Sequence, residues 1–142
     1  YTYVQVPTYD YNSDYYMSAG QYTGLNDALN DIKSAWNNGR ADLMLAHIDP
    51  QTQIAIYLDG NYSYSISGTD YSNMARDAIS RVQTSSLTFD NIEQRSDGAY
   101  TATGTHQFTD IKGNPKTVSV SFTLALKNGQ WVIVAAGSSG SV

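Results

Sequence analysis

The chain has 142 residues, no cysteine and a formal net charge of −5 at pH 7. Its length suits one domain, and the absence of cysteine excludes disulfide bonds and thiolate metal sites. The eight lysine and arginine residues form no cluster, so we expect no nucleic-acid partner. No run reaches the ~20 apolar residues that cross a bilayer, so we expect no membrane insertion.

The surface is expected to be polar but weakly charged. Charged residues make up only 15% of the chain, below the ~25% usual for soluble domains, and serine, threonine, asparagine and tyrosine replace them. Bacterial exported proteins often lack cysteine, whereas small secreted animal domains usually depend on it. We therefore expect a bacterial, extracytoplasmic or secreted protein whose signal segment is absent from this sequence.

Residues 1–22 differ from the rest of the chain, because they hold seven of its twelve tyrosines and almost no aliphatic side chains. Such a segment cannot build a core of its own. It is predicted to be a low-complexity arm or linker. The alternative is an arm whose aromatic rings lie on the domain or on a partner. The folded domain is expected to occupy residues 23–142.

Three helices and a hairpin are predicted in the first part of this domain. Apolar residues at helical spacing predict a helix that Thr23 caps and Gly39 ends. A second, short helix ends at Asp49-Pro50. The turn Asp59-Gly60 between two alternating runs indicates a β-hairpin. A third helix opens at Gly68, with an apolar face that includes Tyr71, Met74, Ala75, Ala78, Ile79 and Val82.

From Thr84 onward the hydrophobic period changes to two. Strands are predicted at 86–95, 99–109, 116–127 and 131–138, and the short turns between them indicate an antiparallel meander. The third of these strands is apolar on one face and carries serine and threonine on the other. One side of the sheet is therefore expected to face a core, and the other to face water or a partner sheet.

The order of these elements resembles the nuclear transport factor 2-like superfamily, close to its SnoaL-like and ketosteroid-isomerase-like groups. The resemblance covers about residues 23–138, and none of its motifs is a catalytic signature. It rests on Leu29-x-x-Ile32-x-x-x-Trp36-Asn37-Asn38-Gly39-Arg40-Ala41-Asp42, on Ser67-Gly68 running into Tyr71, on His106-Gln107-Phe108-Thr109-Asp110 with Gly113, and on Val118 to Ile133.

The resemblance implies an α+β fold with the order α-α-β-β-α-β-β-β-β. The helices would pack in the concave face of a curved, mainly antiparallel sheet and leave a cone-shaped pocket. It also implies a homodimer formed through the outer face of the sheet. Members of the superfamily include isomerases, dehydratases, polyketide cyclases and non-catalytic accessory domains, so the fold does not choose the function.

His106 is the strongest candidate for chemistry. It shares its strand phase with Tyr100, Ala102 and Phe108, so an inward apolar face places the imidazole on the pocket wall. Burial there would lower its pKa and keep it neutral, able to act as a base or a hydrogen-bond partner. Tyr71 is the candidate proton donor. The alternative is a core histidine bonded to a neighbour.

Further candidates could bind a ligand, although aromatic residues at these spacings are also typical of a plain core. The ligand-binding candidates are Trp36, Tyr57, Tyr71, His106, Phe108 and Phe122. An isomerase-like site would need an inward carboxylate, and Asp90 lies out of phase with Leu87 and Phe89. His47 and His106 are far apart and lack carboxylates at ligand spacing, so we expect no metal and no cofactor.

The sequence leaves several functions open. The leading hypothesis is a non-catalytic extracytoplasmic accessory domain that dimerises, or binds a small apolar ligand or peptide in its cone. The alternative is a SnoaL-like enzyme of the isomerase, cyclase or dehydratase type, acting on a small hydrophobic substrate with His106 as base and a tyrosine as donor. A third possibility is a structural domain whose own side chains fill the cavity.

Overall fold

The computed structural model describes residues 19–140, and their side chains from residue 24 onward. Residues 1–18 of the predicted tyrosine-rich arm lie outside the described residues. The elements follow the predicted order. They are α1 (Ala19–Asn38), α2 (Ala41–Leu45), β1 (Gln53–Leu58), β2 (Asn61–Ser67), α3 (Gly68–Arg81), β3 (Gln83–Gln94), β4 (Tyr100–Thr109), β5 (Pro115–Lys127) and β6 (Gln130–Ser139).

The strands form one sheet in the order β2-β1-β6-β5-β4-β3. Strands β3 to β6 pair with antiparallel neighbours, so the predicted meander is confirmed. The hairpin is confirmed as well, because Asp59 and Gly60 both have positive φ, as its tight turn requires. Strand β1 pairs with β6 in parallel. α3 carries the chain from β2, at one edge of this open sheet, to β3, at the other.

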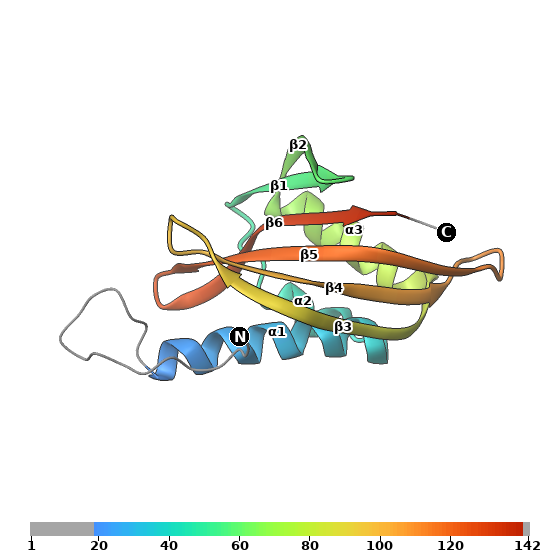
Figure 1. The fold of residues 1–142 in the computed structure, drawn as a ribbon, viewed down its shortest axis with the longest axis horizontal. Coiled ribbons are helices and arrows are strands. Elements are labelled where there is room, and N and C mark those ends of the chain that lie inside the picture. The colour runs from blue at the N-terminus through green and yellow to red at the C-terminus, as the bar shows by residue number, and fades with distance from the viewer. Residues whose placement is uncertain (1–18, 141–142) are drawn as a thin grey trace.

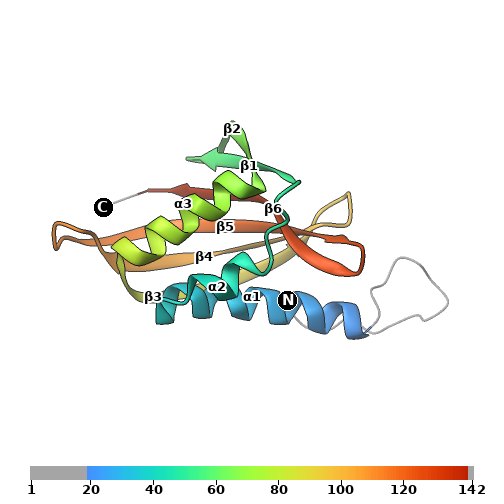
Figure 2. The same cartoon turned by 180° about the vertical axis from the view of Figure 1, so that it is seen from behind.

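All three helices cover one face of the sheet. Figure 1 looks onto the uncovered face, and Figure 2 shows the helices on the other side, with α1 along β3 and α3 across the middle strands. The core lies between the two layers, where each fully buried aliphatic side chain contributes ~1.5–3 kcal/mol. Its largest fully buried side chains are Leu25, Ile32, Met44, Ile54, Leu124 and Ile133.

The sheet curves around the helices, and β-bulges explain part of this curvature. One register shift lies between Phe89 and Asn91, so that Asp90 is an extra residue opposite β4. A bulge bends its strand and increases the local twist. Gly104 makes this bulge possible, because a Cβ at that position would lie 1.8 Å from the Thr88 carbonyl oxygen. Only glycine lets the two backbones approach so closely.

The uncovered face carries the polar set of each alternating strand, and we call it the outer face. It includes Thr103 and Thr105 of β4 and Ser119 and Ser121 of β5, each paired across the two strands. Thr101 and Thr123 continue this pattern, and their hydroxyl oxygens lie 2.8 Å apart.

Among the helices of residues 19–140, none combines the length and apolar character that a membrane span requires.

Several boundaries differ from the predictions. α1 begins at Ala19 rather than at Thr23, because nothing between Ala19 and Thr23 except Gly20 opposes a helix. The cap of α3 is Ser67, whose Oγ accepts a hydrogen bond from the Asp70 backbone N–H at 3.1 Å. β3 begins at Gln83, three residues before the predicted start. Local propensity does not specify these ends, which depend on tertiary contacts.

Candidate functional site

A pocket of about 390 Å³ opens between α3 and the inner face of the sheet, and we call it the cone pocket. Its size lies within the ~300–1,000 Å³ typical of small-molecule sites. Its wall is mainly aliphatic and aromatic, and it contains no Asp, Glu, Lys or Arg side chain. All six predicted ligand-binding candidates line this pocket, namely Trp36, Tyr57, Tyr71, His106, Phe108 and Phe122.

His106 lies on the inner face of β4, as its strand phase predicts, with only 6% of its surface exposed. Its Nε2 atom lies 2.9 Å from the Thr84 hydroxyl, with which it shares a hydrogen bond. Its ring also contacts Phe108, with ring centroids 4.6 Å apart. Burial lowers the pKa of His106 from 6.5 to about 4, so the imidazole is neutral at pH 7.

Trp36 reaches the pocket from the last turn of α1. Its indole ring meets the His106 ring edge-on, with centroids 4.9 Å apart and an interplanar angle of 64°. The indole Nε1 atom is buried, and it has no hydrogen-bond partner among the described residues. Buried polar atoms in folded proteins are nearly always paired, so an unpaired indole N–H needs an explanation.

Tyr71 comes from the first turn of α3, and its side chain is buried, with 8% exposure. Burial raises the pKa of its hydroxyl well above the ordinary value of 10, so the group stays protonated at any physiological pH. No hydrogen bond joins this hydroxyl to another described residue. Tyr71 therefore offers a neutral donor and acceptor at the pocket wall.

Tyr57 differs from the other five candidates, because 39% of its surface is exposed. Ile54 and Ile56 of β1 are buried, so strand alternation turns Tyr57 toward the outer face. There its ring packs edge-on against Tyr62, with centroids 5.8 Å apart. Tyr57 also lines the cone pocket, although its side chain is more exposed than those of the other candidates.

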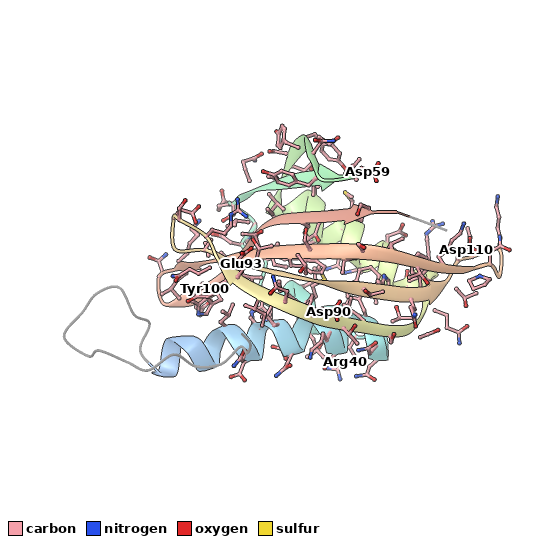
Figure 3. All side chains as sticks on the ribbon, viewed as in Figure 1. Arg40, Asp59, Asp90, Glu93, Tyr100 and Asp110 are labelled. Carbon is pink, nitrogen blue, oxygen red and sulfur yellow. The ribbon has the colours of Figure 1, made fainter. Side chains whose placement is uncertain are left out.

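The remaining charged and titratable candidates lie elsewhere. His47 packs against α1, where its Nε2 atom lies 2.8 Å from Asp31 Oδ2. The Arg40 guanidinium forms an exposed ion pair with Asp42 at 2.8 Å. Asp90 is exposed on β3, as predicted from its strand phase (Figure 3). Residues 24–140 contain no group of three or more possible metal ligands.

Sequence reasoning missed the hydrogen-bond partner of His106 and the exposure of Met74 at the cone pocket. Thr84 lay outside the predicted strand, so its hydrogen bond to His106 could not be foreseen, although the two residues belong to paired strands. Met74 was expected on the buried face of α3, but 47% of its surface is exposed where it lines the pocket. Met74 is exposed because it borders the open cone pocket.

A second hollow of about 340 Å³ lies on the outer face, and we call it the outer groove. Thr103, Thr105, Ser119 and Ser121 line it together with the bulge residue Asp90. Its wall is more polar than that of the cone pocket. The alternation of the strands predicts the hydroxyl groups. The sequence does not reveal the bulge that adds a carboxylate beside them.

No protein-family model matches the chain, and no curated protein matches it. Several solved structures are similar. A nuclear transport factor 2-like protein of unknown function from Shewanella oneidensis MR-1 is 16% identical, with a TM-score of 0.61, over 84% of this chain and 98% of that chain.

Two further structures support the same comparison. A Bacillus subtilis protein provisionally assigned as an isomerase is 14% identical, with a TM-score of 0.66, over 87% of this chain and 88% of that chain. A Nostoc punctiforme protein of unknown function with a cystatin-like fold is 8% identical, with a TM-score of 0.56, over 87% of this chain and 92% of that chain.

These identities establish a shared fold and leave the activity open, because one fold hosts many functions. The similarity extends over nearly the whole length of each compared structure. It agrees with the element order, the curved sheet and the helices on its concave face. The chain therefore has the nuclear transport factor 2-like, cystatin-like α+β fold that its sequence resembles.

Proposed function

We propose that this chain is a non-catalytic, extracytoplasmic accessory domain that binds a small apolar ligand in the cone pocket. The observation that carries the proposal is a wall without charged side chains around a space of about 390 Å³. Apolar pockets with a few placed polar groups are typical of small-molecule sites. Side chains with polar groups in the lining are those of Tyr57, Tyr64, Tyr71, Ser138 and the neutral His106.

The absence of a carboxylate from the pocket wall favours binding over catalysis. Isomerases that abstract a proton next to a carbonyl use an inward carboxylate as base and a second acid to stabilise the enolate. In this chain Asp90 is exposed on the opposite face, and His106 has the Thr84 hydroxyl as its hydrogen-bond partner. A histidine positioned by a hydroxyl, rather than by a carboxylate, is a weaker base.

Binding can be tested with N-phenyl-1-naphthylamine, an uncharged apolar dye that fluoresces when it leaves water. The wild-type protein is expected to bind the dye saturably. Replacing Ala78, a half-buried residue that lines the pocket from α3, with phenylalanine should weaken binding by about tenfold, because the larger ring occupies the space. Ala46→Phe makes the same change at an exposed alanine outside the pocket and should leave binding unchanged.

Circular dichroism and thermal melting of both variants check that they remain folded, since overpacking costs ~1–3 kcal/mol. Two results would count against the proposal. In one, the wild-type protein gives no saturable signal up to the solubility limit of the dye. In the other, the folded Ala78→Phe variant binds the dye as tightly as Ala46→Phe does.

An enzymatic function is the second candidate, because a neutral His106 and a protonated Tyr71 share one pocket wall. Such a pair could remove a proton next to a carbonyl, with His106 as base and Tyr71 as donor. Catalysed hydrogen–deuterium exchange at the α-carbon of 2-tetralone, followed by NMR in heavy water, tests it directly. Exchange that His106→Gln abolishes would support an enzyme, and exchange at the uncatalysed rate would support binding alone.

A homodimer through the outer face is part of the same proposal. None of the three described helices covers this face (Figures 1 and 2), and its side chains on β4 and β5 are mainly small hydroxyl groups. Such a sheet surface suits packing against a second copy of itself, because a two-fold interface uses the same patch twice. Sedimentation of a variant with a charge on the outer face tests the dimer.

A further inference from the structure

We infer that residues 1–6 pair with the free edge of β2 and add a strand to the sheet. This pairing is independent of what the cone pocket binds, and it gives a role to the tyrosine-rich segment. Among the described strands, β2 pairs with β1 alone. In Figures 1 and 2 no described element lies beyond it. One side of its backbone therefore faces no described strand that could receive its hydrogen bonds.

The two edges of the sheet differ in how they are protected. At the β3 edge, Asn37 binds the backbone of Leu87, accepting from its N–H at 2.9 Å and donating to its carbonyl oxygen at 3.4 Å. The same strand carries Asp90 and Glu93, and its register shifts at two places. Charges, bulges and covering helices are the usual means by which proteins keep an edge from pairing with another segment.

β2 has only one of these protections. Its sequence from Asn61 to Ser67 contains no charged residue and no proline. A single register shift leaves Ser63 as an extra residue opposite β1, and from Tyr64 to Ser67 the pairing is regular. None of the residues of β2 is buried. A regular, uncharged and exposed edge is a template for an extended segment.

Apolar side chains are exposed at the same place. Among the described residues, four of the six exposed large hydrophobic side chains belong to β1 and β2, namely Tyr57, Leu58, Tyr62 and Tyr64. Such a cluster is typical of a surface that another segment covers. Tyr64 lines the cone pocket on the inner side of the sheet, and Tyr62 packs against Tyr57 on the outer side. An added strand would therefore have aromatic neighbours on both of its faces.

The chain contains a segment with the properties that this edge requires. Residues 1–6, Tyr-Thr-Tyr-Val-Gln-Val, have no charge, no glycine and no proline, and five of the six are aromatic or β-branched. Alternation places threonine and two valines on one face and two tyrosines on the other. Aromatic and β-branched residues are favourable cross-strand neighbours. The rest of the tyrosine-rich segment suits a strand less well, because it contains Pro7, Asp10 and Asp14.

The connection is long enough for both partners to belong to one chain. Residues 7–18 separate the segment from the start of α1, and twelve residues span up to ~40 Å. α1 lies along β3 (Figure 2), and the strand order puts five strand spacings, or ~24 Å, between β3 and β2. A strand added beyond β2 lies ~29 Å from β3, which is within this reach.

Hydrogen exchange followed by NMR on the full chain tests the pairing. Tyr3→Pro and Val4→Pro, made together, remove two successive N–H groups, one of which must face β2. Asn12→Pro with Ser13→Pro makes the same change in the connection and is the control. We expect the amides of residues 2–6, and those amides of β2 that face away from β1, to be protected in the wild-type protein. The first double variant should raise their exchange rates by about tenfold or more, and the control should not.

Both double variants lie outside residues 19–140, so the described domain keeps its own contacts. Exchange of residues 2–6 at the rate of an unfolded chain in the wild-type protein would overturn the inference. Equal protection of β2 in the wild-type protein and in the Tyr3→Pro, Val4→Pro variant would overturn it as well. Protection that increases with protein concentration would mean that a second copy supplies the segment, and the assignment to one chain would be wrong.

Discussion

The rings of His106 and Trp36 form an edge-type contact, with centroids 4.9 Å apart and planes inclined by 64°. This contact joins the last turn of α1 to the middle of β4 across the wall of the cone pocket. It also packs the neutral imidazole against an indole ring whose buried N–H has no hydrogen-bond partner among the described residues. A change in the charge of His106 should therefore affect both the stability of the fold and the polarity of the pocket.

We predict that His106 makes the protein less stable in acid. Its pKa is 6.5 in the unfolded chain and about 4 in the fold. Between these values the unfolded state binds the proton first, so the free energy of unfolding falls as the pH drops below 6.5. Converting the difference in pKa gives a loss of roughly 3 kcal/mol, complete once the pH is below the folded-state pKa.

Urea unfolding of the wild-type protein and of His106→Gln, at several pH values from 7 to 4, checks this prediction. The variant lacks the titrating group, so its disadvantage at pH 7 should shrink steadily toward pH 4. The same subtraction removes the contribution of the exposed carboxylates whose pKa values are lowered, such as Asp49 beside Lys127. A stability difference that stays constant over this range would contradict the assigned state of His106.

Gly104 is predicted to be the most sensitive glycine on the sheet. Alanine there would place its Cβ 1.8 Å from the Thr88 carbonyl oxygen and 2.8 Å from the Phe89 Cα atom. Both neighbours are backbone atoms, so the bulge itself must move, and we expect a loss of ~3 kcal/mol or more. Gly113→Ala is the control, since its Cβ meets no atom within 4 Å and only its positive φ opposes the change.

The control should cost ~1–2 kcal/mol, which is the usual penalty for a left-handed alanine. Chemical denaturation measures both variants. Gly104 has no positive φ, so its loss comes from the close approach, whereas the loss in Gly113→Ala comes from the backbone conformation. Similar losses in the two variants would mean that the bulge opposite Gly104 relaxes easily.

The elements and the inward phase of His106 could be predicted from the sequence because they depend on local patterns. Alternation along β4 predicts the buried imidazole, and the Asp59-Gly60 turn predicts the hairpin. The bulge at Asp90 could not be predicted, because it depends on which residue of β4 lies opposite it. The unpaired indole of Trp36 was equally hidden, since aromatic spacing says nothing about the surroundings of one nitrogen atom.

Asn37 is predicted to hold α1 against the sheet. Its Oδ1 accepts a hydrogen bond from the Leu87 N–H at 2.9 Å, and its amide donates to the Leu87 carbonyl at 3.4 Å. Asn37→Ala leaves both backbone groups of a buried residue without their side-chain partner, and we expect a loss of ~1–3 kcal/mol. Asn38→Ala removes the neighbouring exposed asparagine and should change the stability by less than about 0.5 kcal/mol.

Thermal and urea unfolding of the two asparagine variants measure this difference. Asn37→Asp is informative as well, because it keeps the acceptor for the Leu87 N–H and loses only the longer bond. It should fall between the wild-type protein and Asn37→Ala. Equal stability of Asn37→Ala and Asn38→Ala would show that the connection to β3 contributes nothing to the fold.

The proposed dimer predicts that a charge placed on the outer face separates the subunits. Ser121 lies at the middle of this face, paired with Thr103 on one side and Gly137 on the other. Ser121→Arg would bury a guanidinium group against its own copy across a two-fold axis, where desolvation and like charge oppose association. In a monomer the same side chain extends into water, so the stability of the fold should change little.

Sedimentation velocity over a range of concentrations tests this prediction. The wild-type protein should approach the mass of a dimer, Ser121→Arg should stay monomeric, and Asn30→Arg, on the exposed side of α1, should behave like the wild type. The matched pair separates a local effect from a general effect of added charge. A wild-type protein that remains monomeric at its highest soluble concentration would show that the outer face meets water. The hydroxyl-lined groove beside Asp90 would then be open to solvent in solution.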